Sequence, residues 1–174
     1  LRFVLGLSTE RIARMFLVST STMAARITRA KKRATLAGFA LTSSRDYPER
    51  SDDVARALSV AYTAAYFAND KATGDLVSLV QQTAWNYPQP ALSALDVLVS
   101  LTHARRAARI DTSGRLLTLA EQDRSLWRSD ETTAALRRYT ALAPSAGYAE
   151  ELRAYATIEA AHSLAPDIER TNWG

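Results

Sequence analysis

The stretch Gly6–Arg33, GLSTERIARMFLVSTSTMAARITRAKKR, decides the expected fold. Ser8 suits the N-cap of a helix, and Glu10 puts a negative charge in its first turn, where it complements the helix dipole. Apolar residues then recur at helical spacing: Ile12, Ala13, Phe16 and Leu17. A short break at residues 18–20 separates this helix from a second one that begins near Ser21. The sequence therefore predicts two helices joined by a tight turn.

The second helix is expected to have one apolar and one basic face. Met23, Ile27 and Ala30 lie at i, i+4 and i+7, so they can pack on the first helix. The other face carries four cations: Arg26, Arg29, Lys32 and Arg33. A helix braced in this way can enter the DNA major groove, and small and hydroxyl residues at its start allow close approach. The alternative is an ordinary amphipathic hairpin with a solvated basic face, but the spacing of cap, turn and core favours a DNA-binding helix-turn-helix.

The charge of the chain is distributed unevenly. Residues 1–41 hold eight Lys and Arg residues against the single acid Glu10, which gives a net charge of +7. The remaining 133 residues hold 14 bases and 17 acids, a net charge of −3, so the whole chain carries +4. A basic head on a mildly acidic body predicts a polyanionic partner for the head alone.

The polar segment 42–50, which contains Pro48, coincides with this change of sign and is the best candidate for a linker. We therefore expect a helix-turn-helix at 1–41, a linker at 42–50 and an all-helical extension at 51–174. No clean repeat period is present, and a tetratricopeptide-like stack of helical hairpins is inferred only from the expected helix lengths. The predicted fold class is all-α.

Helical patterns in the extension are expected at 51–69, 74–87, from Pro90 onward, 121–143 and 148–164. Ser51 or Asp52 is the expected cap of the first of them. Val54 is expected on its buried face, and Trp85 on the buried face of the second. The helix at 121–143 is expected to break near residues 129–130.

Several kinds of chemistry are excluded or unsupported. There is no cysteine, hence no disulfide and no thiolate metal site, which fits a reducing cytoplasm. No apolar run is long enough to span a bilayer. His103 and His162 are isolated and are expected to have packing or surface roles, and the calcium-loop pattern that begins at Asp111 fails at Leu116 and Gln122. With no nucleotide-binding or hydrolase motif either, we expect no enzyme activity, no metal and no cofactor.

Two further groups of side chains are expected to serve packing. The basic cluster Arg105, Arg106 and Arg109 could contact DNA or polymerase, but pairing with Asp111, Glu121 or Asp123 is favoured. Six aromatic residues are expected in the core or between helices: Tyr62, Tyr66, Trp85, Tyr87, Trp127 and Trp173.

A family resemblance becomes clear from several motifs together. Residues 7–13, LSTERIA, and 22–31, TMAARITRAK, resemble region 4 of extracytoplasmic-function sigma factors of bacterial RNA polymerase. Residues 101–114, LTHARRAARIDTSG, and 119–127, LAEQDRSLW, resemble the subgroup that carries a long helical C-terminal extension, as do residues 156–163. The chain is thus similar to such a sigma factor from region 4 onward, and because Leu1 opens within an apolar pattern we expect further sequence before it.

The resemblance implies binding to the −35 promoter element and to core RNA polymerase, with a tetratricopeptide-like regulatory extension that is open to a regulatory protein. Carried over by position, the DNA-binding residues are Ser21, Thr22, Ala25, Arg26, Arg29, Lys31, Lys32 and Arg33, the last three near phosphates. Ala24 stands where sigma factors often have Lys or Arg. The segment 66–69 replaces the Asn-Glu-Gly-Tyr motif of the subgroup.

Two rival functions come from other classes. The helical body could be a protein-interaction module with an incidental basic head, or the chain could be a helix-turn-helix regulator whose body senses a ligand. Steep salt dependence of promoter binding would favour the sigma-factor hypothesis.

Overall fold

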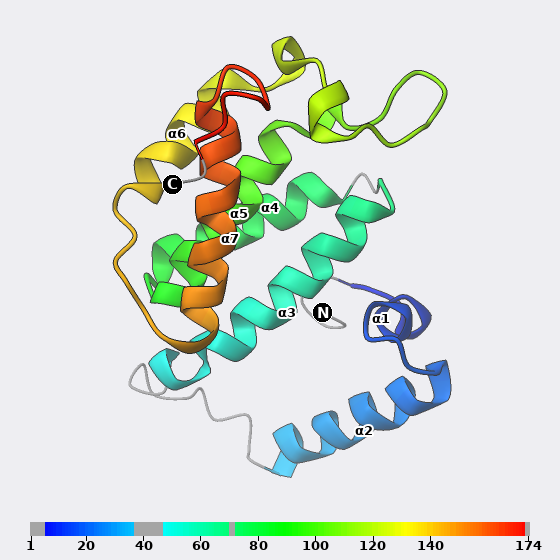
Figure 1. Ribbon diagram of the computed structural model, residues 1–174. Helices are drawn as coiled ribbons and strands as arrows, with labels where there is room; N and C mark the ends of the chain where they lie inside the picture. Colours follow the sequence, from blue (N-terminus) through cyan, green and yellow to red (C-terminus); the bar gives the residue numbers. More distant parts are fainter. Residues whose placement is uncertain (1–5, 37–46, 70–71, 173–174) are drawn as a thin grey trace. The chain divides into compact units, whose positions relative to one another are not determined.

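The computed structural model describes residues 6–36, 47–69 and 72–172, and it is built from helices (Figure 1). The α-helices are α1 (Thr9–Met15), α2 (Thr20–Leu36), α3 (Tyr47–Phe67), α4 (Thr73–Asn86), α5 (Pro90–Ala104), α6 (Ser129–Tyr139) and α7 (Gly147–Leu164). In these residues the sole extended pairing is an isolated bridge between Ile110 and Leu116. The prediction of an all-α fold is confirmed.

The chain divides into two compact units, a first unit at Leu1–Thr73 and a second unit at Gly74–Gly174. The expected division at residues 42–50 stays a prediction. Helix α3 begins at Tyr47, so the last part of that expected linker is helical. None of the helices in the described ranges is long and apolar enough to cross a membrane.

The first unit contains the expected pair of helices, a short α1 and a longer α2. Ser8 caps α1, and its Oγ accepts a hydrogen bond of 3.2 Å from the Arg11 backbone N–H. Ile12, Ala13 and Met23 are buried together, and the partly buried side chains of Leu7, Val18 and Ile27 pack against them. The predicted bracing of α2 by α1 is therefore confirmed.

Three apolar residues of this pair lie elsewhere than expected. Helix α1 ends at Met15, so Phe16 and Leu17 leave the helical path and are 39% and 93% exposed. Leu17 has φ of 51°, and the amides of Leu17 and Val18 donate to the carbonyls of Arg14 and Ala13, the pattern that closes a helix with a left-handed residue. Ala30 is also exposed, because α2 extends beyond the short α1.

In the second unit α5 packs against both α6 and α7. Pro90 starts α5 at a position where its missing N–H costs nothing. The core of these three helices contains Val97, Leu101, Ala135, Ala156 and Ala160. The alanines on α6 and α7 allow the helix axes to approach closely around the larger residues of α5.

Several helix boundaries and burial predictions from α3 onward were wrong. Ser51 does not cap α3 but lies inside it, and its Oγ donates to the Pro48 carbonyl at 2.9 Å. Val54 is 41% exposed and Trp85 is 87% exposed. The helix expected from residue 121 begins only at Ser129, because polar side chains hold short 3-10 turns at 119–121 and 124–126 instead.

The aromatic residues divide into two groups. Tyr62 and Tyr66 are buried with their ring centroids 5.5 Å apart, and Trp127 is half-buried beneath the Arg124 guanidinium, as expected of packing residues. Trp85 and Tyr87 are exposed instead. Trp173 lies outside the described residues.

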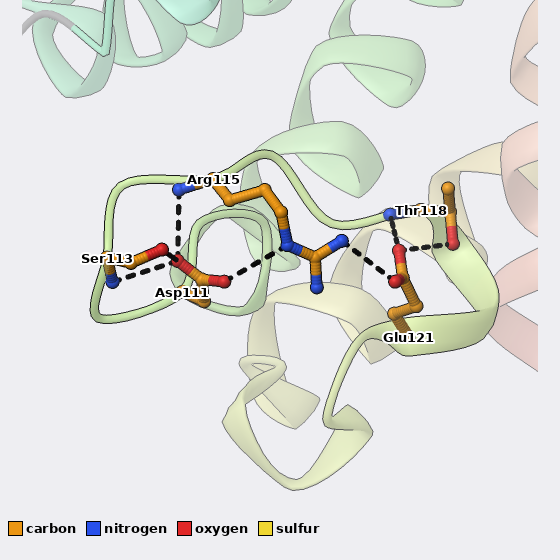
Figure 2. Close-up of polar contacts among 5 residues, drawn as sticks. All are labelled: Asp111, Ser113, Arg115, Thr118 and Glu121. Carbon is orange, nitrogen blue, oxygen red and sulfur yellow. Dashed lines mark hydrogen bonds and ion pairs between the residues drawn. The ribbon is translucent and has the colours of Figure 1, made fainter.

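A polar network shapes the loop that follows α5 (Figure 2). Asp111 Oδ1 accepts hydrogen bonds from the backbone and hydroxyl of Ser113 and from the Arg115 amide. The Arg115 guanidinium joins the two acids, at 3.3 Å from Asp111 Oδ2 and 2.9 Å from Glu121 Oε1. Glu121 also accepts from the Thr118 amide and hydroxyl. Two of the acids expected to pair with the basic cluster, Asp111 and Glu121, therefore pair with Arg115, and Asp123 accepts from the Ser125 amide. Arg105 pairs with Glu159 instead, at 2.6 Å.

Candidate nucleic-acid interface

The site begins at the turn between α1 and α2, where Ser19 starts the second helix. The Ser19 Oγ accepts a 3.2 Å hydrogen bond from the Thr22 amide, which satisfies one of the free N–H groups at the start of α2. The same hydroxyl lies 2.8 Å from the Thr22 hydroxyl and 3.0 Å from that of Ser21. This cap fixes the first turn of the helix and orients its hydroxyl groups.

The sequence pattern predicts Ser19 in the break between the helices, but in the structure Ser19 is the cap, and α2 begins at Thr20 rather than near Ser21. The signal was present in the sequence, since a Ser or Thr directly before a helical pattern is a preferred N-cap. Four consecutive hydroxyl residues at 19–22 each offered a cap, and only the backbone geometry selects one.

The structure places all the predicted DNA-binding residues on α2, and every one of them is exposed: Ser21, Thr22, Ala25, Arg26, Arg29, Lys31, Lys32 and Arg33. With about 100° between successive residues of an α-helix, all but Lys31 lie within an arc of about 140°. Lys31 lies about 160° around the helix from Arg29. One face of α2 therefore displays the predicted set, and Lys31 stands apart from it.

The opposite side of α2 explains why this face points outward. Met23 is 6% exposed and is buried against α1, and Ile27 is partly buried in the same cluster. Both lie outside the arc of predicted DNA-binding residues. Burial of this seam fixes the rotation of α2 about its own axis, so that Arg26 and Arg29 face solvent.

The cations of α2 are electrostatically uncompensated. Helix α2 contains no Asp or Glu. Within the part of the chain that the structure describes, Arg26, Arg29, Lys31, Lys32 and Arg33 form no ion pair. A cluster of like charges without counter-charges destabilises a surface unless a polyanion neutralises it. The arrangement can bind phosphates and can donate hydrogen bonds to guanine edges.

The described residues were also compared with the requirements of a metal site. Within the described residues there is no group of three or more His, Asp or Glu side chains that could hold a metal ion. His103 is buried in α5, in agreement with the packing role expected for it, and burial lowers its pKa.

Comparison with known proteins agrees with this geometry. Residues 1–33 match the family model described as "Sigma-70, region 4". The match supports a protein of the sigma-factor class, whose region 4 is a helix-turn-helix domain that suggests promoter-DNA binding.

The chain belongs to the family described as "Family of unknown function (DUF6596)", whose model matches residues 50–143. It is also 34% identical over 186 residues to "Uncharacterized protein R00370" of Rhizobium meliloti (strain 1021). That alignment covers 99% of this chain and 43% of the relative, so the chain spans less than half of the relative's length. No solved structure matches the chain.

Proposed function

We propose that this chain acts as an extracytoplasmic-function sigma factor that binds the −35 promoter element through α2. The observation that carries the proposal is the exposed cationic face of α2, which is free of carboxylates and braced from behind by α1. The match of residues 1–33 to the region 4 family model supports DNA as the partner of that face.

The residues of this face divide into two roles. Thr22, Ala25, Arg26 and Arg29 lie toward the start and middle of α2 and would face base edges in the major groove, as the start of a recognition helix does. Lys32 and Arg33 lie nearer its end and would bind phosphates. Lys31 points to the other side of the helix, so its phosphate contact is the weakest of the set.

The remaining residues of the chain would serve core RNA polymerase binding and regulation. The family match at 50–143 and the motif resemblance at 101–127 support a helical extension of the kind that such sigma factors carry. We propose that this extension is regulatory and tetratricopeptide-like, and that a regulatory protein binds it. Promoter binding with polymerase places the protein in the cytoplasm.

Selection of bound sequences from a randomised pool of DNA duplexes tests the main proposal. The whole chain should enrich one short motif, and its affinity for the enriched duplex is then measured by fluorescence anisotropy. Raising the salt concentration from 50 to 200 mM should weaken binding roughly 100-fold, as expected for about four phosphate contacts. Failure to enrich any motif, or an affinity that is independent of salt, would contradict the proposal.

Matched arginine variants locate the interface. Arg29→Ala should weaken binding about tenfold and relax the sequence preference at one position. Arg137→Ala removes an arginine of α6 that is likewise exposed and should leave the affinity unchanged. Equal losses in the two variants would show that the binding is non-specific and not carried by α2.

A further inference from the structure

A groove lies among α4, α5 and α6, within the second unit. Its volume is about 760 Å³, in the range of ligand-binding pockets. Its lining includes Gln81, Trp85, Asn86, Asp96, Arg138 and Leu142. An apolar lining with a few convergent polar groups is the usual composition of a small-molecule site.

The floor of the groove holds an ion pair that is neutralised internally. Arg138 Nε lies 2.8 Å from Asp96 Oδ2, and Arg138 Nη2 donates to Ser100 Oγ at 3.0 Å. Ser100 in turn donates to Asp96 Oδ1 at 3.1 Å. The Asp96 side chain is only 8% exposed, and both of its oxygens are engaged. The pair carries no net charge, so a charged ligand would lose hydration here without a net counter-charge to compensate it, which disfavours either sign of charge.

The wall formed by α4 offers stacking and hydrogen bonding. Trp85 is 87% exposed, which leaves a large apolar ring uncovered beside the groove. Gln81, Gln82 and Asn86 line the same space and present three carboxamides, each of which can both donate and accept. Gln81 Nε2 donates to Ser100 Oγ at 3.2 Å, so this carboxamide is fixed in orientation against the floor.

We infer that this groove binds a small, uncharged, planar molecule that combines an aromatic ring with an amide-like edge. Its ring would stack on Trp85, which covers the exposed indole. Its edge would exchange hydrogen bonds with the carboxamides of α4, above a floor that accepts no net charge. The inference rests on the regulatory role proposed for the extension and assigns that role a ligand class.

Three probes with the same ring and different charge test the inference: benzamide, benzoate and benzamidine. They are added to the whole ¹⁵N-labelled chain, and the side-chain NH₂ signals of Gln81, Gln82 and Asn86 are followed by NMR. Benzamide should shift these signals with half-saturation at about millimolar concentration, as expected for so small a molecule. The Gln122 NH₂ group lies outside the groove and should not move. Benzoate and benzamidine should bind at least fivefold more weakly.

Two variants check the site itself. Trp85→Ala should weaken benzamide binding roughly fivefold through loss of stacking. Tyr155→Ala removes an exposed aromatic ring from α7, away from the groove, and should have no effect. Absence of shifts with benzamide, or equal or tighter binding of either charged probe, would overturn the inference. These titrations contain no DNA, so a negative result does not contradict the promoter-binding proposal. A negative result in the DNA selection, in turn, does not contradict ligand binding in the groove.

Discussion

The arginines of the two units have different surroundings. On α2, in the first unit, Arg26 and Arg29 are exposed and have no carboxylate partner within the described part of the chain. In the second unit Arg105 pairs with Glu159, and Arg138 pairs with Asp96. The same residue type thus holds helices together at Arg105 and Arg138 and stays available for an outside polyanion on α2. The presence or absence of a carboxylate partner distinguishes these two sets of arginines.

The difference follows from how acids are placed along the sequence. Helix α2 contains no acid, so no i, i+4 partner can form within it. Helix α6 instead begins with Asp130 and Glu131 and ends with arginines, which complements its dipole at both ends. The charges of α6 are thus arranged to stabilise the helix. The unpaired cations of α2 cost stability, and the binding of an outside ligand explains their presence.

Loss of the Arg105 side chain should produce the largest effect on stability. Arg105→Ala leaves Glu159 charged and mostly buried without a partner, which should lower the free energy of unfolding by about 2–3 kcal/mol. Urea unfolding followed by circular dichroism at pH 7 measures it. DNA affinity should be unchanged, whereas Arg29→Ala should change stability by less than about 0.5 kcal/mol and reduce DNA affinity.

The pH dependence of the Arg105→Ala variant adds a second test. Burial already raises the pKa of Glu159, against the lowering effect of Arg105, and removal of Arg105 should raise that pKa further. An acid with a raised pKa in the folded state loses stability as the pH rises through that pKa. The difference in free energy of unfolding between the wild type and Arg105→Ala should therefore become smaller as the pH falls below this pKa. A difference that is constant with pH would mean that lost packing, and not the charge of Glu159, is responsible.

The sequence predicted the pattern of the α1–α2 pair well because that pattern is local. A cap at Ser8, an apolar seam through Ile12 and Met23, and a basic outer face are all set by residues within one or two turns. The pairing of Arg105 with Glu159 could not be read in this way, because the two residues are 54 positions apart. The exposure of Trp85 likewise depends on which helices pack beside α4 and not on its own periodicity.

The 3-10 turns at 119–126 illustrate a second limit. Residues 121–128 have a helical pattern, yet Glu121 and Asp123 bond to nearby backbone amides and stop a regular helix from forming. The competition between a regular helix and these local side chain–backbone hydrogen bonds depends on small free-energy differences, which the spacing of apolar residues does not reveal.

Removal of the α1 cap should have a smaller effect, confined to the first unit. Ser8→Ala should cost about 1 kcal/mol, because the Arg11 amide loses its acceptor. Hydrogen exchange of that amide should become about fivefold faster, and DNA affinity should fall because α1 braces α2. Ser8→Asp keeps a capping oxygen and should restore both. If Ser8→Ala leaves the DNA affinity unchanged, then packing of α1 against α2 is not what orients the interface.

The smallest effect on stability is expected in the exposed network of Figure 2, where a shift in titration is the clearer measurement. The pKa values of Asp111 and Glu121 are both held at about 2, so these acids contribute stability above their ordinary pKa range and lose it as the pH falls toward 2. The main causes differ: the Ser113 hydroxyl for Asp111 and the Arg115 guanidinium for Glu121.

Two variants should therefore separate the two acids, as measured by NMR titration of their carboxyl carbons. Arg115→Ala should raise the pKa of Glu121 more than that of Asp111, whereas Ser113→Ala should raise only that of Asp111. Glu150, whose pKa is held at about 2 by Arg153 on α7, should stay unchanged in both and serves as the internal control. Equal shifts of both acids in either variant would mean that the loop titrates as one coupled unit. The charged groups of this loop would then act as one network, in greater contrast to the cations of α2, which have no carboxylate partner in the described residues.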